Sequence, residues 1–437
     1  MRFIADKQTL EDLSLLGKYN PHSIFSLFNK VKTRGAEKLL EAMFLQPLTD
    51  AGQINARSAI LQYFTAHPAE FPFADEALDN MEAYVDEGTD SSSLLSFLRV
   101  GRKKLANVIL RDEAFEQEQQ RISSTLKVLQ TCKILLAAIE EKGWQRDSPW
   151  EQWAGVVRPI VHDARLQGLS GANLSFSALA KLRHLLTGVF REQLKKMLAL
   201  TYELDLYIAV AGVARERGFS FATALPKGGN VLSAEGIRHP GLSNAVGNDL
   251  RFSSAQNVLF LTGANMAGKS TLMKSTGILV YLAHMGFPVA AENMRFSVMD
   301  GIYSSVNVPD DINKGYSHFY AEVLRVKTVA AEVAAGKSLF IIFDELFKGT
   351  NVKDAYDATL AVTSAFTAYH ECSFIISTHI FEVGHALMEA GEQIQFRFLP
   401  TVMKGHVPHY TYKLETGITT DRQGMIIIEN EGILQLL

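Results

Sequence analysis

The stretch TGANMAGKST, residues Thr262 to Thr271, is the most informative segment for the fold of this 437-residue chain. From Gly263 to Ser270 it fits the pattern G-x-x-x-x-G-K-[ST], which predicts a phosphate-binding loop where a strand precedes it and a helix follows. The apolar run NVLFLT before it is typical of a buried strand, and the helical pattern after it extends to about Met285. The residues predicted to bind the nucleotide are Gly263, Ala264, Asn265, Met266, Ala267, Gly268, Lys269, Ser270 and Thr271.

The glycines at this spacing let backbone N–H groups converge on phosphate oxygens at a helix N-terminus, where the helix dipole favours negative charge. Lys269 is expected to reach the β- and γ-phosphates of ATP as a catalytic charge, and Ser270 is expected to hold Mg²⁺. A glycine-rich turn with a solvated lysine is the alternative, and the order strand, loop, helix argues against it. ATP and Mg²⁺ are therefore the predicted cofactors.

Two further strand ends carry polar side chains. Asp344 and Glu345 follow the apolar run LFIIF, and His379 follows the run SFIIST. Asp344 is expected in the Mg²⁺ shell, Glu345 is expected to polarise the attacking water, and His379 is expected to sense the γ-phosphate. A carboxylate pair also occurs as a surface cap, and a histidine at a strand end is more often structural. The order of all three elements favours an ATPase that works by positioning and charge neutralisation.

The chain is predicted to have a helical part, residues 1–225, followed by a P-loop ATPase domain, residues 226–437, joined at a linker rich in glycine. The short apolar runs of the second part predict an α/β fold with a mainly parallel, covered sheet. The first part predicts long helices at about 104–142 and 175–218. The simplest arrangement of these two helices is an antiparallel hairpin with an irregular tip that contains the tryptophans, which we expect to form a packed cap on that tip rather than a binding surface.

Composition excludes several classes of protein. The formal net charge of −4 gives no global attraction to nucleic acid, so any DNA contact requires a local basic patch. Two cysteines far apart argue against a disulfide framework or a cysteine metal site. The chain has no uninterrupted apolar run of about 18 residues and no N-terminal signal pattern. We therefore expect a cytoplasmic protein without membrane contact.

Five segments, in order along the chain, resemble the MutS family of mismatch-repair ATPases, a branch of the ABC-type superfamily. The phosphate loop differs from that family's TGPNMxGKST only by Ala264 in place of proline. The other four segments are EGIRHP at 235–240, PDDINKGYSHFYAEV at 309–323, FDELFKGTNVKDA at 343–355 and STHIFEV at 377–383. Residues 26–57 also resemble the start of the family's core domain.

The resemblance implies a homodimer that forms through the ATPase domains. Ser317 would be offered to the γ-phosphate bound by the other subunit, and Asp354 would lie near that junction. Val246 would lie beside the adenine, where the family has an aromatic residue. The resemblance also implies a short form that lacks the mismatch-recognition and connector domains, with long helices acting as levers toward a DNA-holding end.

A basic helix face and a basic run are the candidate DNA contacts. Lys181, Arg191 and Lys195 fall at helical steps on one face, and Arg102 and Lys103 belong to a compact basic run. Phosphate contacts of this kind position a duplex without reading its sequence. A solvated helix face is the alternative.

The leading hypothesis is an ATP-dependent DNA-binding protein of mismatch repair or recombination. Its DNA-coupled ATPase would act on duplex or branched DNA and signal to a downstream repair protein. The alternative is a nucleotide-switched protein-interaction module whose MutS-like ATPase does not bind DNA. A small-molecule kinase ranks third, because no segment resembles an acceptor-binding lid.

Overall fold

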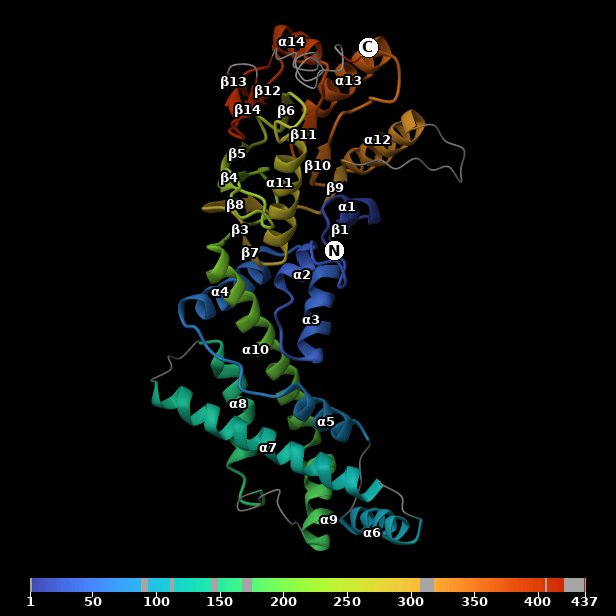
Figure 1. Cartoon of the computed structure of the whole chain (residues 1–437), viewed down its shortest axis with the longest axis vertical. Coiled ribbons are helices and arrows are strands. Elements are labelled where there is room, and N and C mark those ends of the chain that lie inside the picture. Colours follow the sequence, from blue (N-terminus) through green and yellow to red (C-terminus); the bar gives the residue numbers. More distant parts are fainter. Residues whose placement is uncertain are drawn as a thin grey trace. The chain divides into compact units, whose positions relative to one another are not determined.

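The computed structural model describes residues 2–87, 93–110, 114–142, 148–166, 175–306, 318–404, 407–419 and 436. The chain forms two compact units (Figure 1). The sheet unit comprises Met1–Phe28, Met43–Ala59 and Val213–Leu437, and the helical unit comprises Asn29–Ala42 and Ile60–Gly212. The predicted division at residue 225 differs from this grouping, because the N-terminal residues complete the sheet of the C-terminal half.

The sheet unit is built on a seven-stranded sheet with the order β1-β9-β10-β11-β6-β12-β15. The first six strands run parallel and the last is antiparallel to its neighbour. The strands are β1 (Ile4–Ala5), β9 (Gly301–Ser305), β10 (Leu339–Phe343), β11 (Ser373–Ser377), β6 (Val258–Gly263), β12 (Ile394–Leu399) and β15 (Glu415–Thr416). The predicted α/β fold with a mainly parallel sheet is confirmed.

Helices cover both faces of this sheet, as the apolar runs require. Successive residues of a strand point to opposite faces. In β10, Ile341 and Phe343 belong to one core cluster that includes residues of three helices, whereas Ile342 approaches Gly277 on the opposite face. The helices of the cluster are α12 (His318–Ala334), α13 (Val352–Thr367) and α14 (Phe381–Glu389), and the opposite helix is α11 (Lys269–His284). The helix that follows the phosphate loop therefore packs on the face of the sheet opposite to α12, α13 and α14.

Smaller elements complete the sheet unit. A four-stranded sheet has the order β3 (Thr223–Leu225), β8 (Asn293–Ser297), β4 (Leu232–Ile237) and β5 (Asn248–Phe252). Two strand pairs are β2 (Ser220–Phe221) with β7 (Pro288–Val289) and β13 (Thr401–Lys404) with β14 (Val407–Tyr410). Near the N-terminus lie α1 (Lys7–Asp12) and α2 (Ile24–Phe28).

The helical unit contains α5 (Asp75–Asp86), α6 (Ser93–Leu110), α7 (Ala114–Glu141), α8 (Trp150–Val161), α9 (Phe176–His184), a π-helix (Leu185–Val189) and most of α10 (Arg191–Arg217). Three of the four boundaries between the two units fall within α3 (Arg34–Leu45), α4 (Ala51–Ala66) and α10, and the fourth directly follows α2. Helix α7 packs on α5 and α8 and crosses α10 rather than running beside it (Figure 1), so the expected antiparallel hairpin is not formed.

The helix expected at 104–142 is two helices. Residues 104–110 belong to α6, and α7 begins at Ala114. Lys103 Nζ lies 2.6 Å from Glu118 Oε2, whereas in one continuous helix the Cα atoms of these residues would be about 22 Å apart. The ion pair between their side chains therefore belongs to a chain that turns back between them.

The helix expected at 175–218 is interrupted by the π-helix. Phe190 N donates to Leu185 O at 2.8 Å, five residues back, and the Thr187 hydroxyl donates to Arg183 O at 2.9 Å. A hydroxyl that bonds the preceding turn and a glycine, Gly188, both weaken the regular α-helical ladder. The inserted turn shifts the face of every residue that follows it.

Two of the three tryptophans are packed in the core of the helical unit and not on the tip of a hairpin. Trp150 and Trp153 are buried and meet edge to face, and Trp153 Nε1 donates to Thr201 Oγ1 at 3.2 Å. The third, Trp144, lies outside the described residues. By length and composition alone, α7 and α10 are apolar enough to cross a membrane, a test that core helices of soluble proteins also pass.

Candidate functional site: a phosphate loop beside three strand ends

The loop after β6 has the backbone that phosphate binding requires. Gly268 caps α11 with φ 102°, and Gly263 has φ 150°. A Cβ on Gly263 would lie 3.3 Å from Leu399 O, and one on Gly268 would lie 3.1 Å from Tyr412 Cδ1. Both positions therefore favour glycine, for conformation and for space. Met266, with φ 66°, is the single non-glycine residue of the loop in the left-handed region.

The side chain of Lys269 folds back onto the phosphate loop. Its Nζ donates to Gly263 O at 2.8 Å and to Ala264 O at 3.2 Å, and the residue is 6% exposed. Burial lowers the pKa of Lys269, and the carboxylates of Asp344 and Glu345 oppose that shift. An ammonium group has three donors, so one remains for a phosphate oxygen.

Asp344 joins the phosphate loop to the sheet. Its Oδ2 accepts from Ser270 Oγ at 2.5 Å, and its other oxygen, Oδ1, accepts from Ser377 Oγ at the end of β11. The strands β10, β11 and β6 are neighbours and parallel, so their carboxyl ends meet at one edge. The structure thus brings together the two residues predicted to hold the metal. A hydroxyl and a carboxylate oxygen are hard ligands of the kind that Mg²⁺ takes together with water and phosphate oxygens.

Glu345 and His379 also meet at this edge. His379 Nε2 lies 2.7 Å from Glu345 Oε1, and Lys348 Nζ lies 3.2 Å from Glu345 Oε2. The hydrogen bond from His379 lowers the pKa of Glu345 to about 2, although burial opposes the shift. Glu345 has φ 53°, a conformation that costs a non-glycine residue free energy and that concentrates at functional sites.

A cavity of about 450 Å³ extends from the loop to the four-stranded sheet. It is lined by all nine predicted loop residues except Gly263, by Glu345 and by the predicted Val246. His239, Leu242 and Tyr412 line it as well, and sequence reasoning missed them. Tyr412 lies just before β15, far along the chain from the loop, and no spacing pattern links the two.

Of the two residues predicted to act at a dimer junction, the structure describes Asp354 and does not describe Ser317. Ser317 lies outside the described residues. Asp354 is exposed in the first turn of α13, where its backbone N–H donates to Asn351 Oδ1 at 3.0 Å and its carboxylate accepts from Asn351 Nδ2. These two hydrogen bonds give Asp354 a structural role at the start of α13. That role is independent of the predicted position of Asp354 near the dimer junction.

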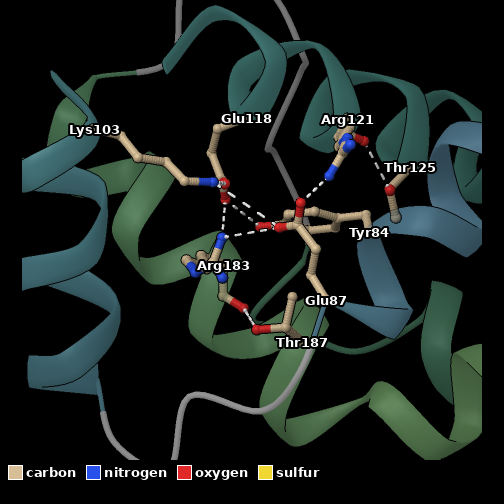
Figure 2. A network of polar contacts seen from close by, with 8 residues as sticks. All are labelled: Tyr84, Glu87, Lys103, Glu118, Arg121, Thr125, Arg183 and Thr187. Atoms are coloured by element: carbon tan, nitrogen blue, oxygen red, sulfur yellow. Dashed lines mark hydrogen bonds and ion pairs between the residues drawn. The ribbon is translucent and has the colours of Figure 1, made fainter. Parts of the chain in front are cut away.

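Three of the five candidate DNA contacts have ionic or backbone partners within the helical unit. Lys103 pairs with Glu118, Lys195 Nζ lies 2.6 Å from Asp86 Oδ1, and Arg191 Nε donates to Val85 O at 2.9 Å. Figure 2 shows Lys103 pointing into the unit toward Glu118, which also faces Tyr84 and Arg183. Arg102 and Lys181 are exposed.

Two family models match the chain: MutS domain III over residues 8–211 and MutS domain V over residues 259–435. Among similar proteins is the DNA mismatch repair protein MutS of Carboxydothermus hydrogenoformans, 30% identical over 271 residues, which are 60% of this chain and 31% of that protein. The MutS protein of Thermus thermophilus is 34% identical over 197 residues, 44% of this chain and 23% of that one. The MutS protein of Petrotoga mobilis is 25% identical over 374 residues, 81% and 41% of the two chains. The chain thus spans less than half the length of these relatives.

Proposed function

Because the chain belongs to the MutS family and carries its ATPase domain, we propose that it hydrolyses ATP at sites shared by two subunits and couples hydrolysis to binding of DNA. The observation that supports this most strongly is the meeting of Ser270, Asp344, Glu345 and His379 beside the phosphate loop. Four residues from three separate segments converge there, in the arrangement that phosphoryl transfer to water needs.

The loop would hold the phosphates, and Lys269 would neutralise the β- and γ-phosphate charge with its remaining donor. Ser270 and Asp344 would hold Mg²⁺, which supplies charge neutralisation at the phosphate oxygens. The hydroxyl–carboxylate hydrogen bond between them joins the two groups that would share the ion. Tyr412 and Val246 line the same cavity, and a flat aromatic face and an apolar side chain suit an adenine ring.

Glu345 would orient the attacking water as an ionised carboxylate. With a pKa of about 2 it stays charged throughout the neutral range, so it acts by accepting a hydrogen bond more than by holding a proton. His379 fixes one carboxylate oxygen and Lys348 the other, which limits the directions in which Glu345 can point. His379 is itself at the surface of the site, where it can sense a γ-phosphate.

The sites would be completed in a homodimer, with Ser317 of one subunit acting on the nucleotide of the other and Asp354 near the junction. This part of the proposal rests on the resemblance of residues 309–323 and 343–355 to the family's segments. We further propose, from the sequence, that the protein works in the cytoplasm, without membrane contact, in mismatch repair or recombination with a downstream repair protein as partner.

DNA is proposed as duplex or branched, held through phosphate contacts of the helical unit. Arg102 and Lys181 are the better candidates, because Lys103, Arg191 and Lys195 already have partners. The same pairing favours a second function, a nucleotide-switched module that binds another protein and not DNA. A unit in which three of the five candidate cations already have partners offers fewer cations for counterion release.

The test is steady-state ATP hydrolysis at low salt, alone and with intact, mismatched and branched duplexes. If DNA changes the rate, and if Arg102→Glu with Lys181→Glu abolishes that change and lowers the salt dependence of binding, DNA coupling stands. A matched control is Lys127→Glu, a charge reversal at an exposed lysine of α7. Hydrolysis that ignores every duplex would leave the protein-interaction module as the function.

A further inference from the structure

Ser377 is the last residue of β11, and this strand lies between the strand that leads into the phosphate loop and the strand that ends just before Asp344. The backbone of Ser377 is in register with Leu261 of β6, and the preceding residue, Ile376, is in register with Phe343 of β10. Ser377 is 0% exposed. Pairing and complete burial therefore hold this side chain at the edge of the sheet where the site is assembled.

The hydroxyl of Ser377 joins the two acidic residues of the site. It donates to Asp344 Oδ1, and it accepts from the backbone N–H of Glu345 at 3.3 Å. A hydroxyl has a single hydrogen, so the donor of Ser377 is committed to Asp344 while a lone pair serves Glu345. Replacing the serine by alanine would remove both interactions at once.

The backbone of Ser377 holds the same turn. The N–H of Asp344 donates to Ser305 O of β9 at 3.0 Å. Two residues later, the N–H of Leu346 donates to Ser377 O at 3.3 Å. The chain thus changes its partner strand at Glu345, which has the left-handed φ of 53°. Such a conformation persists only where the surrounding structure holds it, and Ser377 binds the backbone on both sides of that change.

The other oxygen of Asp344 faces the phosphate loop. Asp344 Oδ2 accepts from Ser270 Oγ, and these are the two groups that would share Mg²⁺. Because Ser377 holds Oδ1, rotation of the carboxylate is restricted and Oδ2 stays directed at the loop. A hydrogen-bond partner that orients a metal ligand matters energetically: removing one typically costs about 10- to 100-fold in metal affinity or activity.

We propose that Ser377 is a positioning residue for the metal site and for the carboxylate that orients the attacking water. It directs the metal-facing oxygen of Asp344 through Oδ1, and it fixes Glu345 through the backbone. The inference rests on the proposed function, in which Ser270 and Asp344 hold Mg²⁺. Ser377 is not among the described residues that line the nucleotide cavity, so its effect reaches the nucleotide through these neighbours.

A second serine of β11 provides a matched control. Ser373, the first residue of the strand, is also 0% exposed, and its hydroxyl donates to Asn230 Oδ1 at 2.8 Å. It lies about 13 Å along the strand from Ser377. Ser373→Ala and Ser377→Ala therefore each remove one buried hydroxyl and its hydrogen bond from the same strand, but only the second variant frees the carboxylate of Asp344.

The test measures how much Mg²⁺ tightens the binding of a fluorescent ADP, a quantity that needs no hydrolysis. The ratio of the Kd in EDTA to the Kd in saturating Mg²⁺ reports the coupling between nucleotide and metal. Ser377→Ala should lower this ratio about tenfold and leave the Kd in EDTA unchanged, because the metal ligand is then free to rotate. Ser373→Ala should keep the wild-type ratio. The Mg²⁺ concentration that half-saturates ATP hydrolysis should rise about tenfold in Ser377→Ala alone.

Two further variants separate the hydrogen bonds from a general structural role. Ser377→Cys fills the same space with a weak donor, so it should lose the ratio as Ser377→Ala does. It also takes the place of Ser377→Ala if that variant fails to fold. Asp344→Ala removes the residue through which Ser377 acts on the metal, so adding Ser377→Ala to it should change the ratio no further.

A wild-type ratio in Ser377→Ala and Ser377→Cys would overturn the proposal. An equal loss in Ser373→Ala would also overturn it, because the effect would then belong to any buried hydroxyl of the strand. If wild-type protein hydrolyses ATP while the Ser377 variants keep its ratio, the proposed function stands without this inference. If Mg²⁺ does not change nucleotide binding by the wild type, the metal site of the proposed function itself fails.

Discussion

Replacing Glu118 by glutamine should destabilise the helical unit severely, although only the charge changes. Glu118 is 1% exposed, and its carboxylate faces Lys103, Arg183 and Tyr84 (Figure 2). Glutamine keeps the shape, but its amide N–H₂ must face one of two cations. Arg183, itself 1% exposed, would lose the carboxylate nearest to it, since Glu87 lies farther away, at 3.9 Å.

The magnitude follows from the burial of the pair. Removing one partner of a buried ion pair costs about 3–5 kcal/mol, because the other charge stays buried without compensation. The free energy of unfolding of a folded domain is about 5–15 kcal/mol in total, so this loss is a large share of the domain's stability. Burial raises the pKa of Glu118, but hydrogen bonds and charge from Lys103 and Arg183 outweigh burial and leave the pKa below its ordinary value of 4.5. The stabilisation is therefore complete above about pH 4.5 and is lost as pH falls through the lower folded-state pKa.

Urea unfolding followed by tryptophan fluorescence is the suitable assay, because the two described tryptophans, Trp150 and Trp153, are buried in the helical unit. The control is Glu140→Gln, which breaks the exposed pair of Glu140 with Arg158 and should cost at most about 1 kcal/mol. The difference in unfolding free energy between wild type and Glu118→Gln should be constant from about pH 5 to about pH 8. A loss no larger than that of Glu140→Gln would refute the reasoning.

Three further predictions concern the nucleotide site. Gly268→Ala should weaken ATP binding about tenfold in a fluorescent-nucleotide titration, since a left-handed backbone costs alanine about 1–2 kcal/mol and its Cβ would crowd Tyr412; unchanged affinity would contradict this. Tyr412→Ala should raise the Kd for ATP about tenfold with kcat at saturation retained, since stacking on a base is worth about 1–3 kcal/mol, and an unaltered Kd would remove Tyr412 from the adenine site. Because the pKa of Glu345 is about 2, kcat of the wild type should show no acid limb from this residue between about pH 4 and about pH 8. In His379→Gln the limb should move upward toward pH 4.5 and lower kcat at about pH 4; identical profile shapes over this range would contradict the pairing.

The residues of the site were predictable from the sequence because their signals are local. A strand, a glycine-rich loop and a helix follow one another without interruption, and the strand ends at Asp344 and His379 carry polar side chains after apolar runs. Parallel strands with their carboxyl ends at one edge bring these segments together without further information. The neighbouring order of β10, β11 and β6 then accounts for the contacts of Asp344 with Ser270 and Ser377.

The features that the sequence did not predict depend on contacts between residues far apart in the chain or on local interruptions of helices. Strand β1 joins a sheet whose other strands all lie in the second half of the chain, and its two residues, Ile4 and Ala5, give no periodic signal. Tyr412 reaches the cavity through the path of the chain after β12. The end of α6 at Leu110 and the π-helix at Leu185–Val189 interrupt apolar patterns that are helical on both sides, so hydrophobic periodicity alone does not detect these interruptions.

The pairing of charged side chains in the helical unit could not be predicted from the sequence for the same reason. Helical spacing places Lys181, Arg191 and Lys195 on one face only if the helix is regular, and the π-helix lies between the first and the other two. Acidic partners such as Asp86 and Glu118 come from other helices, so a one-dimensional pattern cannot show that a basic side chain is already neutralised.

Hydrolysis of ATP by this chain depends, on the proposal above, on Glu345 at the carboxyl end of β10. The decisive measurement is phosphate release from Mg²⁺-ATP by wild-type protein and by Glu345→Gln, side by side, with ATP binding measured for both. We expect that the wild type turns over, while Glu345→Gln binds ATP as tightly and loses about a hundredfold or more in rate. Equal rates in the two proteins would rule out this role for Glu345.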